Sequence, residues 1–557
     1  MKSATFLQAT QSLRPLALLG IGILAGAVAF AEAKSSNADE PVVMKPIVRR
    51  FLSAPTKTTS PILAPNLKSA PSSKSELPAD TYVATTLLPP PVSREFRAAW
   101  ISSVGENSWL NQLTGKPATV QKAALVAMLD RAVQLRLNAI IFQVRPACDA
   151  LYASSLEPWS EYLTGVMGKS PQPYYDPLAF IVEEAHQRGL ELHAWFNPYR
   201  AHHADARSPI SANHISRTRS ELVRRYGKYL WLDPGERDVQ DYTLRVVLDV
   251  VKRYDIDGVH FDDYFYPYHE KDASGQLIDF PDEASWNKFG ANTKLTRDDW
   301  RRENVNTFIQ RVQNAVHAVK PWVKFGISPF GIWRPGYPPQ IKGKDAYAEL
   351  YADARKWIQN GWADYFAPQL YWNIENPAQS FSVLLNWWSE QNAMNRHLWP
   401  GLDATKVGND RWTPDQIAQQ IRLTRQLSPP GQILWGMRNL MPNRTGLAEK
   451  LQTEVYAAPA LVPATPWLAT NAPPARPKLT AKAGNTSTRL VWSKTDSSPV
   501  RFWVLQRRVN GNWITDILPA NHNTCELSGR PQIVAITALD STGRASAPAV
   551  LELPTVN

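Results

Sequence analysis

Eight apolar runs with the character of β-strands, separated by helical patterns, constrain the fold of this chain more than any other feature of the sequence. The runs lie at residues 94–104, 137–146, 190–200, 256–265, 323–331, 364–372, 397–404 and 432–440. Strands that alternate with helices form parallel sheets, because each helix carries the chain back to the end at which the strand began. Eight such units over about 350 residues predict an α/β fold, the (β/α)8 TIM barrel.

An open, doubly wound parallel sheet is the alternative to the barrel. That fold usually carries a glycine-rich phosphate-binding turn after its first strand, and none follows residues 94–104. The helical pattern from Asp176 to Arg188, with Pro177 in the first turn and Gly189 as a stop, shows that the segments between strands have the right length and punctuation. We therefore favour the closed barrel.

The chain of 557 residues is longer than one domain needs, because single cores stop growing at roughly 250–300 residues. We divide it into a signal peptide at 1–33, a disordered Pro/Ser-rich tether at 34–93 and the barrel at 94–455. A linker at 456–476 and a small β-sandwich at 477–557 follow. The sandwich is predicted from short alternating strands and the Asn510–Gly511 turn.

The first 33 residues predict export. A basic start precedes an apolar stretch from Leu16 to Phe30, and small residues follow at the expected cleavage site. A retained membrane anchor is the alternative, but the apolar stretch is shorter than the roughly 20 residues that a spanning helix needs. We expect the protein in the periplasm or cell envelope.

Charge and aromatic content indicate the kind of partner. The net charge of +11 favours anionic surroundings, and for an exported protein we expect association with the cell wall or a membrane surface. No basic stripe with a recognition-helix pattern supports nucleic-acid binding. The 21 tryptophans favour a glycan, because flat rings stack on sugar faces. Two cysteines, Cys148 and Cys525, are too few for a disulfide framework.

The strongest catalytic candidates end the fourth strand. Side chains alternate between the barrel interior and the outer helices. If Val259 and Phe261 face the helices, then His260 and Asp262 point inward, and Asp263 lies at the exit of the strand. Adjacent carboxylates before an aromatic run repel each other and are partly desolvated, which raises the pKa of at least one and suits a proton donor.

Other inward residues near strand ends are candidates for binding the substrate, because barrel enzymes keep their sites at the carboxyl ends of the strands. We assign to substrate hydrogen bonding and stacking Arg145, Asn197, Arg200, Gln369, Tyr371 and Trp372. For Arg145 and Arg200, an ion pair with the aspartates is the alternative role.

Motifs for metal or nucleotide chemistry are missing from the sequence. His202, His203 and Asp205 cluster after the third strand, but their spacing matches no firm ligand motif. No nucleophile elbow, P-loop or zincin motif is present either. We expect neither a metal nor a cofactor.

Several motifs between residues 94 and 455 together resemble one known family. They are FRAAWISSV, FQVRPACDALY, EPWSEYLTG, LHAWFNPYR, LWLDPG and DGVHFDDYFYPY. They resemble glycoside-hydrolase-like family 10, a group of bacterial envelope proteins. The resemblance implies a TIM barrel that hydrolyses a glycan, with peptidoglycan as the leading substrate. Residues 477–557 resemble a fibronectin type III module, with Trp492 as its core tryptophan.

Glycosidic cleavage needs an acid for the leaving oxygen and a second group that supplies or activates the nucleophile. Asp262 or Asp263 is the expected acid. The second group is either Asp403, at the end of the seventh strand, or the acetamido group of the substrate, oriented by one of the paired aspartates. Asp149 and Glu157, after the second strand, are further candidates for a catalytic carboxylate, with a structural role as the alternative. A hydrolase of another exported polysaccharide and a non-catalytic glycan-binding scaffold are the alternative functions.

Overall fold

The computed structural model describes residues 81–408, 412–443 and 445–554. The predicted signal peptide and most of the predicted tether lie outside the described residues. Within them, no helix is both long and apolar enough to span a bilayer.

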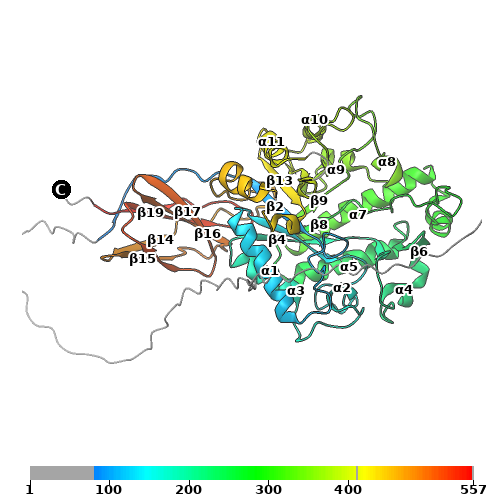
Figure 1. Cartoon of the computed structure of the whole chain (residues 1–557), viewed down its shortest axis with the longest axis horizontal. Coiled ribbons are helices and arrows are strands. Elements are labelled where there is room, and N and C mark those ends of the chain that lie inside the picture. The colour runs from blue at the N-terminus through cyan, green and yellow to red at the C-terminus, as the bar shows by residue number, and fades with distance from the viewer. Residues whose placement is uncertain (1–80, 409–411, 444, 555–557) are drawn as a thin grey trace, which may run out of the picture. The chain divides into compact units, whose positions relative to one another are not determined.

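Nine parallel strands form one continuous sheet (Figure 1). They are β2 (Phe96–Ile101), β3 (Ala139–Arg145), β4 (Glu191–Phe196), β8 (Gly258–Phe261), β9 (Lys324–Ile327), β10 (Tyr365–Phe366), β11 (His397–Leu398), β12 (Gly401–Asp403) and β13 (Gly431–Trp435). Each of the eight predicted runs contains at least one of them, which confirms an α/β barrel.

The sheet closes through one interrupted strand. β11 pairs with β10, and β12 pairs with β13, which in turn pairs with β2. Only Trp399 and Pro400 separate β11 from β12, and proline interrupts a ladder because it has no N–H to donate. The two short strands therefore act together as the seventh strand of the ring.

Helices follow the strands and pack around them (Figure 1). The longer ones are α1 (Ala118–Gln134), α3 (Pro177–His186), α5 (Arg237–Arg253), α7 (Arg297–Val319), α9 (Ala354–Asn360), α10 (Phe381–Gln391) and α11 (Pro414–Thr424). Short helices are α2 (Glu161–Thr164), α4 (Ile215–Thr218), α6 (Glu283–Ser285), α8 (Ala346–Glu349), α12 (Met437–Leu440) and α13 (Leu447–Lys450). α3 begins as predicted, since the side chain of its N-cap Asp176 accepts from Ala179 N at 3.0 Å.

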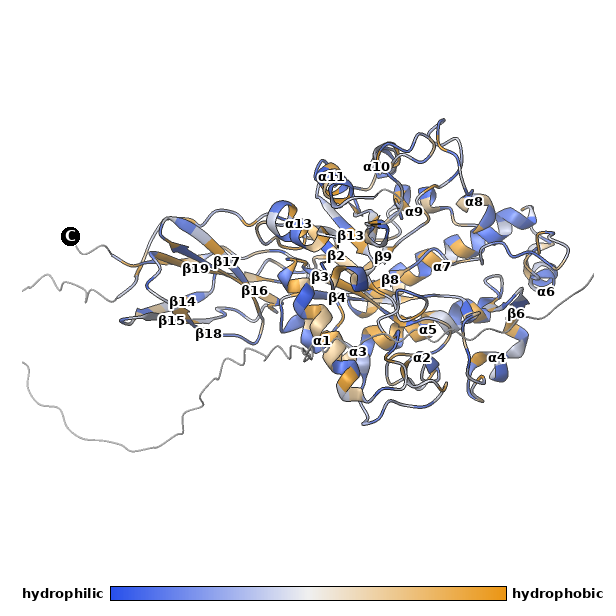
Figure 2. Cartoon of the chain, viewed as in Figure 1, coloured by the Kyte–Doolittle hydropathy of each residue, from blue (hydrophilic) through white to orange (hydrophobic). Residues whose placement is uncertain are grey.

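The barrel strands contribute to two separate cores. The larger core, between strands and helices, contains Val259 and Phe261 from β8, as the alternation of the sequence predicted. The smaller core lies inside the ring and comprises Phe96, Ala98, Trp100, Ala139, Ile141, Trp195, Tyr365, Ala367, Trp399 and Ile433. Figure 2 shows helices such as α1 and α7 carrying both hydrophobic and hydrophilic residues, as expected for helices with one buried face.

A small antiparallel sheet follows β4. It contains β5 (Arg200–His202), β6 (Val223–Tyr226) and β7 (Tyr229–Leu232), in the order β5-β7-β6. Leu232 N donates to Tyr199 O at 2.7 Å, which ties β7 to the start of β5. This sheet fixes the backbone of Arg200, the first residue of β5.

Two antiparallel sheets share a core in the C-terminal region. One contains β14 (Lys478–Ala483), β15 (Ser487–Ser493) and β18 (Thr524–Ser528). The other contains β1 (Val83–Ala84), β16 (Phe502–Val509), β17 (Asn512–Pro519), β19 (Ile533–Leu539) and β20 (Ala549–Glu552). Trp492 of the first sheet and Trp503 of the second lie in the common core, with 2% and 3% of their surface exposed. The resemblance to a fibronectin type III module stays a prediction.

The structure corrects the expected end of the tether. Residues up to 93 were expected to be disordered, yet Val83 and Ala84 pair with Glu552 and Leu551 of β20. Tyr82 is buried and donates to Pro531 O at 2.6 Å. Burial of a tyrosine ring and the pairing of the backbone offset the entropy of ordering this segment. Residues 81–84 therefore belong to the C-terminal module rather than to a tether.

Candidate active site

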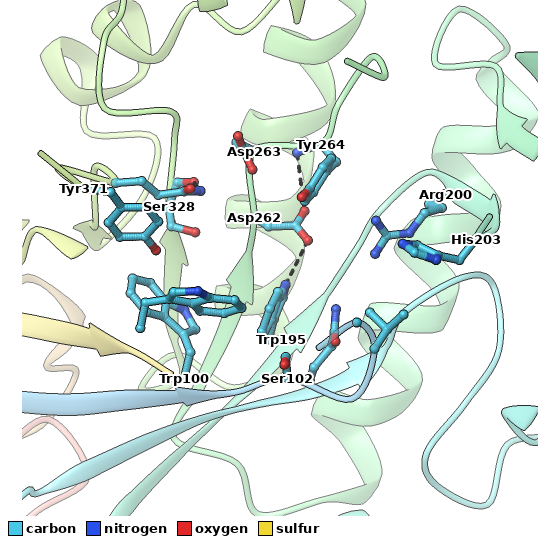
Figure 3. A pocket seen from close by; sticks show the side chains of 15 residues that line it. Trp100, Ser102, Trp195, Arg200, His203, Asp262, Asp263, Tyr264, Ser328 and Tyr371 are labelled. Atoms are coloured by element: carbon cyan, nitrogen blue, oxygen red, sulfur yellow. Dashed lines mark hydrogen bonds between the residues drawn. The ribbon is translucent and has the colours of Figure 1, made fainter. Parts of the chain in front are cut away.

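A pocket of about 310 Å³ lies at the carboxyl ends of the barrel strands (Figure 3). Seven of the eight strand positions in the ring, or the loops that follow them, contribute to its wall. The lining residues are Trp100, Ser102, Val104, Gly105, Gln143, Trp195, Arg200, His203, Asp262, Asp263, Tyr264, Ser328, Gln369, Tyr371 and Trp435. Three tryptophans and two carboxylates in one concave site are the groups that a glycan would need for stacking and for proton transfer.

Asp262 lies directly after β8, and its carboxylate is held by two donors from the neighbouring strand. Trp195 Nε1 donates to Asp262 Oδ2 at 3.0 Å (Figure 3). Asn197 Nδ2, just beyond the end of β4, donates to the same oxygen at 3.2 Å. Burial raises the pKa of Asp262 to about 7, and the nearby carboxylate of Asp263 adds to the rise, against the opposing charge of Arg200 and the two donors. At neutral pH this carboxyl can hold or release a proton.

Asp263 has a different environment from its neighbour. The Tyr268 hydroxyl donates to its Oδ2. Burial raises the pKa of Asp263, while hydrogen bonds from Tyr268 and Gln369 act in the opposite direction. Two adjacent carboxyls therefore differ in their donors, which is how active sites separate a proton-carrying group from an ionised one.

A buried chain of hydrogen bonds runs from the pocket through the barrel interior. The indole Nε1 of Trp100 donates to His260 Nε2 at 3.1 Å, so the ring proton of His260 is on Nδ1, which donates to Tyr365 Oη at 2.9 Å. Tyr365 then donates to His193 Nδ1 at 2.9 Å, and His193 Nε2 faces Glu191 at 3.2 Å. Burial holds the pKa of His260 well below its ordinary value. The chain fixes the Trp100 ring in the pocket wall.

Five of the nine predicted site residues line the pocket. They are Asp262, Asp263, Arg200, Gln369 and Tyr371. Burial raises the pKa of Tyr371 well above its ordinary value, and the carboxylates of Asp403 and Asp263 add to the rise. The hydroxyl of Tyr371 therefore stays protonated and able to donate.

Arg145 lies outside the pocket lining, contrary to its assigned contact with the substrate. The register of β3 against β4 shifts between Gln143 and Arg145, so Gln143 lines the pocket and Arg145 does not. Arg145 is fully buried, forms an ion pair with Glu157 at 2.6 Å and donates to Asn197 O at 2.7 Å. It supports the loop after β4 and pairs with neither Asp262 nor Asp263.

Asn197 also acts from behind the pocket wall. Its Nδ2 donates to Asp262, and its Oδ1 accepts from the backbone N–H of Arg200 at 2.8 Å. Both ends of the amide are therefore engaged with the protein. Asn197 therefore positions Asp262 and the start of β5 from outside the pocket lining.

Asp403 and Trp372 are likewise outside the pocket lining. Asp403 Oδ1 accepts from Thr405 N at 3.0 Å and from Thr405 Oγ1 at 2.6 Å, so it caps the short turn at 404–406. The ring of Trp372 packs edge-on against Phe330, with 5.7 Å between ring centroids. Asp403 therefore caps a turn and does not line this pocket.

The further carboxylate candidates, Asp149 and Glu157, have structural partners as well. Asp149 Oδ1 accepts from Ala147 N at 2.9 Å, and Glu157 holds Arg145 and the Tyr242 hydroxyl. Within the described residues, no group of three histidine, cysteine, aspartate or glutamate side chains is arranged to hold a metal ion.

Sequence reasoning missed most of the aromatic wall. Trp100 and Trp435 line the pocket together with Trp195 and Ser328. The sequence did contain a signal for Trp100. This residue lies two and four positions after Ala98 and Phe96, which face the barrel interior, so the strand alternation that identified Asp262 also predicts that Trp100 faces inward. Ser328 follows β9 and gives no comparable signal.

Comparisons with known proteins identify the family of this chain. The family model described as Glycosyl hydrolase-like 10 matches residues 95–417. The glycosyl hydrolase YngK of Bacillus subtilis is 44% identical over 401 residues, which are 70% of this chain and 76% of that protein. The glycosyl hydrolase DigH of Escherichia coli K12 is 36% identical over 339 residues, covering 57% of this chain and 74% of that protein.

A solved structure of the PgaB (BpsB) glycoside hydrolase domain from Bordetella bronchiseptica is also similar, with 14% identity and a TM-score of 0.43 over 65% of this chain and 98% of that one. The family model spans more than half of the 557 residues. The matched region contains β2 to β12 and both aspartates of the pocket. The chain therefore belongs to the glycosyl hydrolase-like 10 family of glycoside hydrolases.

Proposed function

We propose that this glycoside hydrolase cleaves glycan strands of the bacterial envelope, with peptidoglycan as the leading substrate, and that Asp262 is its general acid. The observation that carries the proposal is the pair of differently held carboxyls in a tryptophan-lined pocket. A carboxyl with a pKa of about 7 is protonated in a large fraction of molecules near neutral pH. That property suits the donation of a proton to a leaving glycosidic oxygen.

The second catalytic role falls to the substrate in this proposal. Asp403 caps a turn away from the pocket lining, so no carboxylate beyond Asp262 and Asp263 lines the described pocket. An N-acetylated sugar carries its own nucleophile, the acetamido oxygen. Asp263, held by Tyr268 and Gln369, would orient that group and stabilise the positive charge that develops on it.

Product analysis tests the activity. Residues 81–557 would be incubated with intact peptidoglycan and with peptide-free glycan strands, and soluble fragments would be identified by mass spectrometry. We expect fragments from the wild type and none from Asp262→Asn. If fragments come only from another exported polysaccharide, the substrate assignment is wrong. If no glycan is cleaved, the non-catalytic scaffold becomes the better explanation.

A leaving-group test separates the roles of the two aspartates. An aryl N-acetylglucosaminide with a very acidic phenol needs no acid catalyst for departure, whereas a disaccharide does. We expect Asp262→Asn to retain much of its rate on the activated aryl substrate and to lose the disaccharide reaction. Asp263→Asn should lose both. The reverse pattern would assign the acid to Asp263.

We also propose export to the periplasm or envelope, on the basis of residues 1–33, and a fibronectin type III-like identity for residues 477–557. Fusion of residues 1–93 to a reporter enzyme that is active only outside the cytoplasm tests the export. Activity of the reporter in cells supports it, and an inactive but intact fusion contradicts it.

A further inference from the structure

Arg200 differs from the other buried arginines of the described residues. Arg97, Arg145 and Arg301 each form an ion pair with a carboxylate, at 2.7, 2.6 and 2.7 Å. Arg200 is 5% exposed, yet its one side-chain hydrogen bond is from Nε to Pro146 O at 3.0 Å. Within the described residues, its two terminal nitrogens have no acceptor.

The geometry holds the guanidinium in the pocket wall. The Nε bond fixes one edge of the group, and the Tyr264 ring lies beneath it, 5.0 Å from the guanidinium carbon. Arg200 lines the pocket on the same side as His203 (Figure 3). A guanidinium fixed in this way keeps its terminal N–H groups pre-oriented, so little conformational entropy is lost when an acceptor binds.

His203 adds a further donor beside Arg200. Its Nδ1 accepts from the backbone N–H of Asp205 at 3.1 Å. Burial and the charge of Arg200 lower the pKa of His203 to about 4, so the ring is neutral at physiological pH and its single proton is on Nε2. Within the described residues, Nε2 has no hydrogen-bond partner.

The catalytic aspartates do not use these donors. Asp262 accepts from Trp195 and Asn197, and Asp263 accepts from Tyr268, but neither receives a hydrogen bond from Arg200. The terminal N–H groups of Arg200 are open to the pocket, where they can donate to an acceptor on a bound sugar. The fork of a guanidinium matches the two oxygens of a planar carboxylate better than it matches a single hydroxyl.

We propose that Arg200 and His203 form a carboxylate-binding subsite, which selects a sugar unit that carries a free carboxylate. The inference rests on the proposed function, because it names the chemistry of the glycan that this pocket accepts. Two kinds of sugar provide this chemistry: a uronic acid, with the carboxylate on the ring, and a muramic-type sugar, with the carboxylate on an ether-linked lactyl group.

Binding of monosaccharides tests the subsite without turnover, because these probes contain no bond to cleave. Glucuronic acid, N-acetylmuramic acid and the methyl ester of each would be titrated against residues 81–557 and followed by NMR. We expect at least one acid to bind about tenfold or more tightly than its ester, since a hydrogen bond to a charged group is worth at least that factor. The acid with the larger ratio identifies the kind of sugar.

Variants show whether Arg200 is responsible. Arg200→Gln should remove the difference between acid and ester, whereas Arg200→Lys, which keeps the charge but not the fork, should retain part of it. Arg219→Gln is the matched control, because this arginine is exposed and lies outside the pocket. Thermal unfolding of each variant checks that it is folded.

Two results would overturn the subsite: equal binding of acid and ester by the wild type, including no measurable binding of either, or a difference that persists in Arg200→Gln. Failure of the proposed function is distinguishable from both. A protein that discriminates acid from ester but releases no fragments from any wall glycan has the subsite without the proposed activity. A protein that releases fragments from a wall glycan but binds acid and ester equally has the proposed activity without the subsite.

Discussion

Replacing Asp262 by asparagine should abolish hydrolysis of unactivated glycans and at the same time stabilise the folded protein at neutral pH. Burial makes the Asp262 carboxyl hard to ionise, so its pKa is about 7 in the folded protein against an ordinary value of 3.8. Asparagine is isosteric and uncharged. Its side-chain oxygen can still accept from Trp195 and Asn197, which donate to Asp262 Oδ2 in the native site.

The magnitude follows from proton linkage. The folded-state pKa is raised, so below about pH 4 the carboxyl is protonated in both states and ionisation costs no stability. As the pH rises from 4 to 7, the Asp262 carboxyl loses its proton in the unfolded chain but keeps it in the folded protein. The free energy of unfolding therefore falls. At about 1.36 kcal/mol per pH unit, the loss reaches roughly 4 kcal/mol above pH 7. Any fixed cost of the amide is the same at every pH.

Urea denaturation followed by tryptophan fluorescence, from pH 4 to pH 8, measures this difference. The gap in unfolding free energy between Asp262→Asn and the wild type should grow by about 4 kcal/mol in favour of the variant. Asp415→Asn is the control, because that side chain is 64% exposed and lies outside the pocket lining. If the difference in unfolding free energy between Asp262→Asn and the wild type does not change with pH, the argument that burial raises the pKa of this carboxyl to about 7 is refuted.

Other predictions concern the same site and its support. The value of kcat/KM for glycan cleavage should fall as the pH rises through about 7, because Asp262 then loses the proton it donates. Arg200→Gln should move this alkaline limb to higher pH, since the arginine lowers the pKa of Asp262; an unchanged limb in a pH–rate profile would contradict this. Tyr365→Phe leaves two buried histidine nitrogens unpaired and should destabilise the fold by about 2–6 kcal/mol in urea denaturation. Glu157→Gln takes the counter-charge from fully buried Arg145 and should cost about 3–5 kcal/mol, whereas a cost below about 1 kcal/mol would rule out the ion pair as the support of this loop.

The barrel and the position of the two aspartates in the pocket could be predicted from sequence because both depend on local periodicity. Alternation along β8 separates Val259 and Phe261, which pack under the helices, from Asp262, which lines the pocket. Every strand in a closed barrel obeys the same alternation. The carboxyl ends of parallel strands meet at one face, so strand ends far apart in sequence could be grouped into one site without knowledge of contacts.

The remaining errors arose where the chain departs from regular strands. A register shift in β3 turns Arg145 away from the pocket, and β12 ends at Asp403, whose side chain caps the turn that follows. The alternation along a strand predicts whether a side chain faces the inside or the outside of the barrel. It does not predict whether that side chain already forms a hydrogen bond to a neighbouring turn. Residues 81–84 were misassigned for another reason, because their strand partner β20 lies at the opposite end of the sequence.

The difference between the two adjacent aspartates depends on such distant segments. Asp262 receives its donors from β4, whereas Asp263 receives the Tyr268 hydroxyl from the loop after β8 and a bond from Gln369 at the end of β10. Two neighbouring carboxyls have nearly the same intrinsic acidity, so only their surroundings can give them separate roles. A substitution at Asn197 should therefore change the acidity of Asp262 far more than that of Asp263. The barrel brings donors from different segments to each of the two carboxyls, and the proposed roles of acid and partner require such a difference.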